Sequence, residues 1–197
     1  MHRALRTVLG LGLAALAACS GGELVGIHVQ LQQDGTGTVT VRTLMEPTTT
    51  GSAETRAQGV TWQSRAGLAC AQGRFAQIDD LKLGDGSIRF VAELGDARPN
   101  MRVFLQRGPE AAWVKGLVPD QAARQAMAKV YDPTGRTREI GDVLRIEVAV
   151  PGQVFASGVR PTGRGVEAAH EGKRAYLLVP VRTALEAGDE LEWSFSW

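Results

Sequence analysis

The sequence predicts an α+β domain in which a mainly antiparallel β-sheet packs against a short helical block, preceded by a lipoprotein signal peptide. Residues 25–31 and 191–197 alternate apolar and polar side chains, which is the period of a half-buried strand. Residues 120–131 instead repeat their apolar side chains at i, i+4 and i+8, which is the period of a helix. Strands before and after one helical block, joined by tight turns, are typical of the α+β class.

The first two strands form a predicted hairpin. Apolar residues alternate over residues 25–31, residues 34–37 read Asp-Gly-Thr-Gly, and the alternation resumes at residues 39–41. Asp and Gly tolerate the backbone angles of a tight reversal, so this turn joins two antiparallel strands. A second hairpin is expected over residues 75–94, with the Gly-Asp-Gly of residues 84–86 at its turn.

Further strands are expected over residues 101–105, 144–150 and 175–181. The last of these is more continuously apolar, which predicts a more buried strand. The closing strand has the clearest pattern of all. Its apolar members are Leu191, Trp193, Phe195 and Trp197.

A helix is predicted from Asp120 to Tyr131. Pro119 stands at an allowed early position, and Asp120 lies near the positive end of the helix dipole. A short preceding helix over residues 109–115 is compatible with the sequence. The apolar face of the main helix comprises Ala122, Ala126, Met127 and Val130.

The beginning of the chain has the pattern of a bacterial lipoprotein signal. Two arginines precede an apolar stretch over residues 8–16, which is too short to span a bilayer. Leu16-Ala17-Ala18-Cys19 then resembles a lipobox, in which a small residue precedes a cysteine that is acylated. We therefore expect Cys19 to become the lipidated N-terminus, with palmitate among its acyl chains. An ordinary export signal with an incidental cysteine, or a buried helix, is the alternative.

This interpretation divides the chain into three parts. Residues 1–18 are the signal peptide, residues 19–23 are the lipidated cysteine and a short tether, and residues 24–197 are a single α+β extracytoplasmic domain. Two or three acyl chains suffice for stable anchoring, because each buried CH₂ contributes about 0.8 kcal/mol. We expect the cell envelope as the location. Ser20, rather than Asp, after the cysteine favours an outer membrane over an inner one, if the organism has both.

Composition and motifs exclude several function classes. The chain has 22 basic and 21 acidic residues, and its net charge is +1. This balance does not indicate the clustered basic surface that nucleic-acid binding usually needs. No phosphate-binding glycine loop, nucleophile elbow, zinc-protease motif or C-x-x-C is present. We therefore expect no nucleic-acid partner, no cofactor, no metal site, no catalytic residues and no enzymatic activity.

Single residues are the remaining candidates for chemistry. His28, on the polar face of the first strand, and His170, in a predicted polar loop, are candidate general bases, although lone surface histidines are usually solvated. Asp79, Asp80 and Asp85 suggest paired carboxylates or a hard-cation site. Neighbours on a strand point to opposite faces, so a polar strand edge and its turn is the favoured interpretation.

Cysteine, tryptophan and arginine offer further alternatives. Cys70 has no intramolecular partner once Cys19 is acylated, and its apolar context predicts a small buried residue. Trp193 and Trp197 share a strand face, for which core filling is favoured over stacking on sugar rings. A scattered solvated face is likewise favoured over a headgroup-binding patch for the basic residues Arg98, Arg102, Arg107, Arg160, Arg164, Lys173 and Arg174.

Several short motifs resemble the LppM-like bacterial lipoprotein domain family. Besides the lipobox, they are the hairpin of residues 31–37, the strand and turn Val-Ala-Val-Pro-Gly-Gln-Val of residues 148–154, and the closing strand with Trp193. The resemblance spans most of residues 24–197. It implies a fold similar to domains that bind lipids or peptides in a sheet-and-helix groove, and no established enzymatic activity. The chain differs from the family in lacking a C-terminal transmembrane helix and in its longer stretch over residues 155–174.

Three functions follow as hypotheses. We favour a membrane-anchored lipoprotein whose non-enzymatic domain binds a lipid, a peptide or an envelope partner. A structural or assembly accessory of the envelope is the alternative, and an envelope hydrolase with an unrecognised site is less favoured. A cavity between sheet and helix would support the first, a flat apolar patch the second, and a cleft joining His28 or His170 to carboxylates the third.

Overall fold

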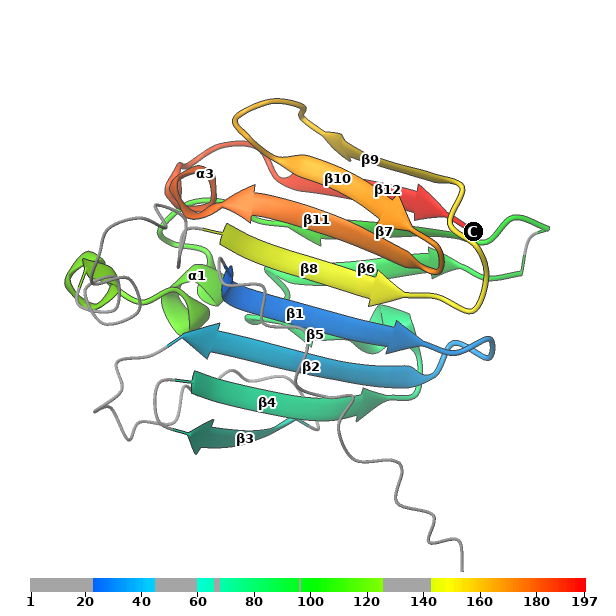
Figure 1. The fold of residues 1–197 in the computed structure, drawn as a ribbon, viewed down its shortest axis with the longest axis horizontal. Coiled ribbons are helices and arrows are strands. Elements are labelled where there is room, and N and C mark those ends of the chain that lie inside the picture. Colours follow the sequence, from blue (N-terminus) through cyan, green and yellow to red (C-terminus); the bar gives the residue numbers. More distant parts are fainter. Residues whose placement is uncertain (1–22, 45–59, 66–67, 96, 126–142) are drawn as a thin grey trace, which may run out of the picture.

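A computed structural model describes residues 23–44, 60–65, 68–95, 97–125 and 143–197. These residues form two β-sheets and several short helical segments, which confirms the predicted α+β class (Figure 1). The signal peptide, Cys19 and most of the tether lie outside the described residues. None of the helices that the structure describes is long and apolar enough to cross a membrane.

The larger sheet has seven strands in the order β10-β11-β8-β1-β2-β4-β3. The β1–β8 pair is parallel and every other pair is antiparallel. The predicted first hairpin is confirmed, with Val29 opposite Val39. The strand bounds are Glu23–Leu31 (β1), Gly37–Leu44 (β2), Val60–Arg65 (β3), Leu68–Phe75 (β4), Val143–Ala149 (β8), Glu167–Glu171 (β10) and Arg174–Pro180 (β11).

The smaller sheet has five antiparallel strands in the order β5-β6-β7-β12-β9. The predicted turn at residues 84–86 joins β5 to β6, and the predicted closing strand pairs with both β7 and β9. The bounds are Lys82–Leu83 (β5), Ile88–Glu93 (β6), Asn100–Leu105 (β7), Ala156–Arg160 (β9) and Leu191–Ser196 (β12).

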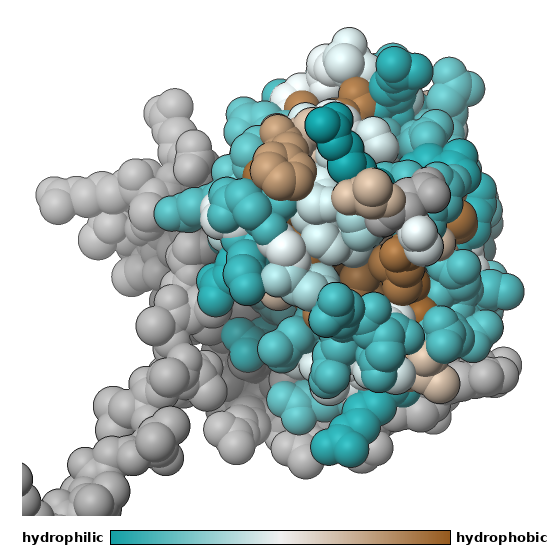
Figure 2. All heavy atoms as spheres, turned by 90° about the vertical axis from the view of Figure 1, so that its right-hand side faces the viewer, coloured by the Kyte–Doolittle hydropathy of each residue, from teal (hydrophilic) through white to brown (hydrophobic). Residues whose placement is uncertain are grey.

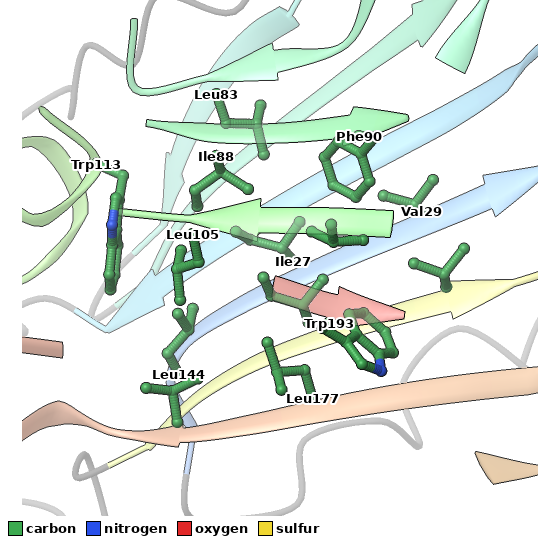
Figure 3. Packing of buried hydrophobic residues seen from close by; sticks show 14 of the residues in the cluster. Ile27, Val29, Leu83, Ile88, Phe90, Leu105, Trp113, Leu144, Leu177 and Trp193 are labelled. Atoms are coloured by element: carbon green, nitrogen blue, oxygen red, sulfur yellow. The ribbon is translucent and has the colours of Figure 1, made fainter. Parts of the chain in front are cut away.

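The hydrophobic core lies between the two sheets. Alternation along each strand sends one set of side chains inward, and Ile27, Phe90, Leu177 and Trp193 meet there from strands of both sheets (Figure 3). Each of these side chains is at most 1% exposed. Burial of a large apolar side chain contributes about 1.5–3 kcal/mol, so this layer holds the sandwich together.

The helices occupy a different place from the one predicted. A second sheet, rather than a helical block, covers the face of the larger sheet, while α1 (Ala112–Leu117) and α3 (Val181–Leu185) lie together at one end of the sandwich (Figure 1). A 3₁₀ segment, η1, spans Ile78–Asp80. Trp113 of α1 is fully buried and donates its indole N–H to the carbonyl oxygen of Gln106 at 2.7 Å, so α1 plugs this end.

The predicted helix of residues 120–131 is described only over its beginning. Residues 121–125 are helical, and Asp120 caps them, because its Oδ1 accepts the backbone N–H of Ala123 at 2.8 Å. Ala122 is exposed there, so the predicted apolar face does not extend to this residue. Residues 126–131, with the rest of that face, lie outside the described residues.

Candidate functional site

A cleft opens at the end of the sandwich opposite α1 and α3. Three connections meet there, namely those between β1 and β2, β6 and β7, and β8 and β9, together with the residue that follows β12. The cleft has a volume of about 510 Å³. Its lining residues are Gln32, Gln33, Leu94, Ala97, Pro99, Pro151, Gly152, Gln153, Phe155 and Trp197.

The β1–β2 turn places two of the lining glutamines. The carboxylate of Asp34 accepts the hydroxyl of Thr36 at 2.7 Å and its backbone N–H at 3.0 Å, which closes the turn locally. These hydrogen bonds, that to the hydroxyl first, hold the pKa of Asp34 below its usual value. Gly35 takes the left-handed φ of 86° that the reversal requires. Gln32 and Gln33 therefore project from a fixed turn.

The β8–β9 connection is fixed by backbone hydrogen bonds. The N–H of Val154 donates to the Gly172 carbonyl oxygen and that of Phe155 to the Ser196 carbonyl oxygen, both at 2.9 Å. Val154 turns into the core and is 2% exposed. Phe155, the next residue, points the other way and is 66% exposed. Among the described residues, it is the one large hydrophobic side chain that is exposed.

Trp197 forms the floor between these connections. Its backbone N–H donates to the Pro99 carbonyl oxygen at 3.0 Å, and a Cβ added at Gly152 would lie 2.8 Å from its indole Cδ1. Gly152 is therefore needed for the indole to lie against the loop. Trp197 is 7% exposed, so most of its surface is covered by the surrounding residues.

The chemistry of the cleft is apolar and amide-like. None of its described lining residues carries a titratable side chain, and its polar side chains are three glutamine amides. Figure 2 shows this end of the molecule, where pale and brown residues meet within a teal surround. An exposed aromatic ring beside unpaired amides suits recognition of an uncharged ligand, but it supplies neither a nucleophile nor a general acid.

A second cluster, which we call the charged network, lies on the outer face of the larger sheet. Arg145 of β8 links two carboxylates, with Nη1 3.2 Å from Glu23 Oε1 and Nη2 3.1 Å from Glu147 Oε2. His28 Nδ1 lies 3.6 Å from the same Glu147 oxygen, and Arg174 Nη1 lies 3.5 Å from Oε1. The register of the sheet causes this meeting, because His28 pairs directly with Glu147.

Electrostatics favours an ionised Glu147. The polar contact with His28 is the main cause that lowers its pKa, and the positive charges of Arg145 and Arg174 lower it further against the opposing effect of burial. Both oxygens of Glu147 are therefore engaged by cations or by imidazole. The network lies on a sheet face and contributes no residue to the cleft lining.

The other predicted candidates are not brought together. His170 is exposed on the edge strand β10 rather than in a loop, since it pairs with Ala175. Asp79 lies in η1, not on a strand, and its Oδ1 accepts the backbone N–H of Ala92 at 2.8 Å, a structural role. Asp85 lies in the β5–β6 turn at φ 52°. No group of three metal-ligating residues occurs in the part of the chain that the structure describes.

Trp193 and Trp197 are buried, as the favoured interpretation of core filling predicted. Trp193 is fully buried, and its indole N–H donates to Ser157 Oγ at 2.9 Å. Of the basic residues, Arg102 lies near Glu93, Arg164 pairs with Glu186, and Arg174 joins the charged network. Cys70 lies on β4 opposite Arg42, and Cys19 lies outside the described residues.

Sequence reasoning missed the cleft. Phe155 and Gln153 follow no strand period, because they stand in the β8–β9 connection, where backbone geometry alone decides their direction. One signal was present, since an aromatic residue stands two positions after the Pro-Gly-Gln turn and directly before β9.

The fold and the cleft together define a two-layer β-sandwich domain of the α+β class with a cleft at one end. The chain is similar over 97% of its length to the NMR structure of the folded domain of the Mycobacterium tuberculosis LppM protein, of which it covers 94%. The sequence identity is 9% and the TM-score 0.47, which is a distant structural relationship. No family model matches the chain, and no curated protein matches it.

Proposed function

We propose that this chain is a lipid-anchored protein of the bacterial cell envelope, whose domain binds a lipid, a peptide or another envelope component in the end cleft. The observation that carries this proposal is Phe155. A ring that is 66% exposed beside an open cleft leaves apolar surface in water, and a bound partner would cover it.

The place of the cleft relative to the anchor supports the proposal. Residues 19–23 reach at most about 14 Å when extended, so the Glu23 end of β1 stays near the lipidated Cys19. β1 has nine residues and is roughly 30 Å long, and the cleft begins just beyond its other end. The cleft is thus at the end of the sandwich remote from the attachment point, where a partner reaches it from the aqueous side.

The cleft supports binding rather than catalysis. Acid–base or nucleophilic chemistry needs a titratable or nucleophilic side chain at the ligand, and the described lining residues offer only amides, aromatic rings and aliphatic groups. His28 and Glu147 belong to the charged network outside the cleft. A non-enzymatic binding module therefore fits this site better than a hydrolase.

Acylation of Cys19 tests the anchor directly. Cells that express the full chain should incorporate labelled palmitate, and Cys19→Ser should abolish the label and leave an unprocessed precursor in a gel. Cys70→Ser is the matched control, because it removes the other cysteine of the chain and should keep the label. Undiminished labelling of Cys19→Ser would refute the lipoprotein proposal.

A further inference from the structure

We infer that the cleft takes an extended, uncharged, proline-rich peptide segment; this inference rests on the proposed function of the cleft as a binding site. Charge is the first argument. None of the side chains of the described lining residues is charged, so a phosphate, a carboxylate or a basic side chain of a ligand would meet no side chain of opposite charge there. A charged ligand side chain would lose part of its hydration without forming an ion pair with a lining side chain, which favours a segment with neutral side chains.

The polar groups of the cleft are the second argument. The side chains of Gln32, Gln33 and Gln153 are exposed and form no hydrogen bond with the described residues. A fatty-acyl chain in the cleft would cover these amides without pairing them, which is unfavourable. A peptide backbone supplies carbonyl acceptors for their N–H groups.

Trp197 adds one more donor. The indole N–H groups of Trp113 and Trp193 donate to Gln106 and Ser157. That of Trp197 donates to no described residue, and its Nε1 is not among the buried polar atoms that lack a partner in the described part of the chain, so this N–H is open to solvent. It is therefore free to donate to a carbonyl oxygen of a ligand at this edge of the cleft.

Shape is the third argument. The walls are rigid, because Pro99 and Pro151 have fixed φ angles and Trp197 lies against Gly152. Proline-rich segments form the polyproline II helix, which has no internal hydrogen bonds, and they dock in aromatic-lined grooves at a low entropic cost. Phe155 supplies an exposed ring for the proline faces, and the glutamines and Trp197 supply donors for the free carbonyls.

Calorimetry on the acylated full chain in detergent tests this inference. The probe is a decaproline peptide with blocked ends, compared with a blocked Gly-Ser peptide of equal length, a neutral chitin tetrasaccharide and palmitate. We expect saturable binding of decaproline alone. Phe155→Ala and Gln153→Ala should each weaken it, the former at least tenfold, with an unchanged melting temperature because both side chains are exposed.

Matched variants locate the effect. Gln106→Ala removes an exposed glutamine near α1 at the opposite end, and Phe104→Ala truncates a ring that stacks with Arg89 on the smaller sheet. Both should bind decaproline like the wild type. No decaproline binding, or binding that Phe155→Ala leaves intact, would overturn the inference. Phe155-dependent binding of the tetrasaccharide or palmitate instead would overturn the peptide assignment and leave the binding cleft standing.

Discussion

The aromatic residues at and beside the last strand have two different roles. Trp193 and Phe195 lie on the inner face of β12 and Trp197 directly follows the strand, with successive ring centroids 4.7 Å and 6.0 Å apart. Their alternation with polar residues was enough to predict this core position. Phe155 is a neighbour of that strand through its hydrogen bond to Ser196, yet its ring is exposed. No periodicity distinguishes it, and only the structure shows its surroundings.

The charged network depends on single residues that strand pairing brings together. His28 and Glu147 are 119 positions apart in the sequence, and only the parallel pairing of β1 with β8 brings them together. Sequence patterns placed His28 on the polar face of a strand and stopped there. The Glu147 side chain is 12% exposed and lies in contact with two arginines. Among the residues of the charged network, its substitution should therefore lower the free energy of unfolding most.

We predict that Glu147 makes stability depend on pH in the acid range. Its pKa in the folded chain lies below its ordinary value of 4.5, so the unfolded chain binds this proton more readily. The stabilisation is therefore complete above about pH 4.5 and is lost as the pH falls through the folded pKa. Glu147→Gln does not titrate and should lower the free energy of unfolding by about 1–3 kcal/mol at pH 6.

Urea unfolding at pH 6 and pH 3 measures this dependence. The difference between wild type and Glu147→Gln should be larger at pH 6 than at pH 3. Glu171→Gln, an exposed change on β10, serves as the control and should differ little from wild type at either pH. An equal difference for Glu147→Gln at both pH values would show that the network does not hold this carboxylate ionised.

At the scale of elements, α1 closes one end of the sandwich, and its position depends on a close contact with the β5–β6 turn. Ser87 Oγ donates to the Gly84 carbonyl oxygen at 2.6 Å and accepts the backbone N–H of Trp113 at 3.0 Å. On the other side, Thr43 Oγ1 of β2 donates to the Leu117 carbonyl oxygen at 2.7 Å. One short helix thus connects both sheets, and its approach leaves no space at Gly84.

Gly84→Ala should destabilise the domain more than Gly86→Ala. Both glycines have positive φ, 56° and 87°, so both substitutions strain the backbone. At Gly84 the added Cβ would also lie 2.5 Å from the backbone N of Trp113, whereas at Gly86 it would meet nothing within 4 Å. We expect Gly84→Ala to cost about 1–3 kcal/mol more in chemical unfolding. Equal losses for the two variants would contradict the tight contact with α1.

At the scale of the whole molecule, local patterns predicted strands and turns well. The hairpin of β1 and β2, the turn at residues 84–86 and the alternation in β12 all follow from side-chain period and turn chemistry. The pairing of β1 with β8 and the division into two sheets could not be predicted, because long-range pairing leaves no mark on a single strand. The helices were therefore assigned to the sheet face that a second sheet covers.

The cleft was beyond sequence reasoning for the same reason. Its lining comes from connections centred near residues 33, 97 and 153, and each of them alone reads as an ordinary polar turn. These connections lie at one end of the sandwich (Figure 1), and the cleft that they line is the proposed binding surface of the molecule.

Site-specific photo-crosslinking in living cells tests that surface most directly. A photoreactive phenylalanine analogue would replace Phe155 in the cleft or, as the control, the exposed Glu167 on β10. We expect adducts with a peptide or protein component of the envelope at position 155, reduced by added decaproline, and none at position 167. Adducts at position 167 with none at position 155 would contradict the proposed binding cleft, since the partner would then bind at the edge of the sheet and not in the cleft.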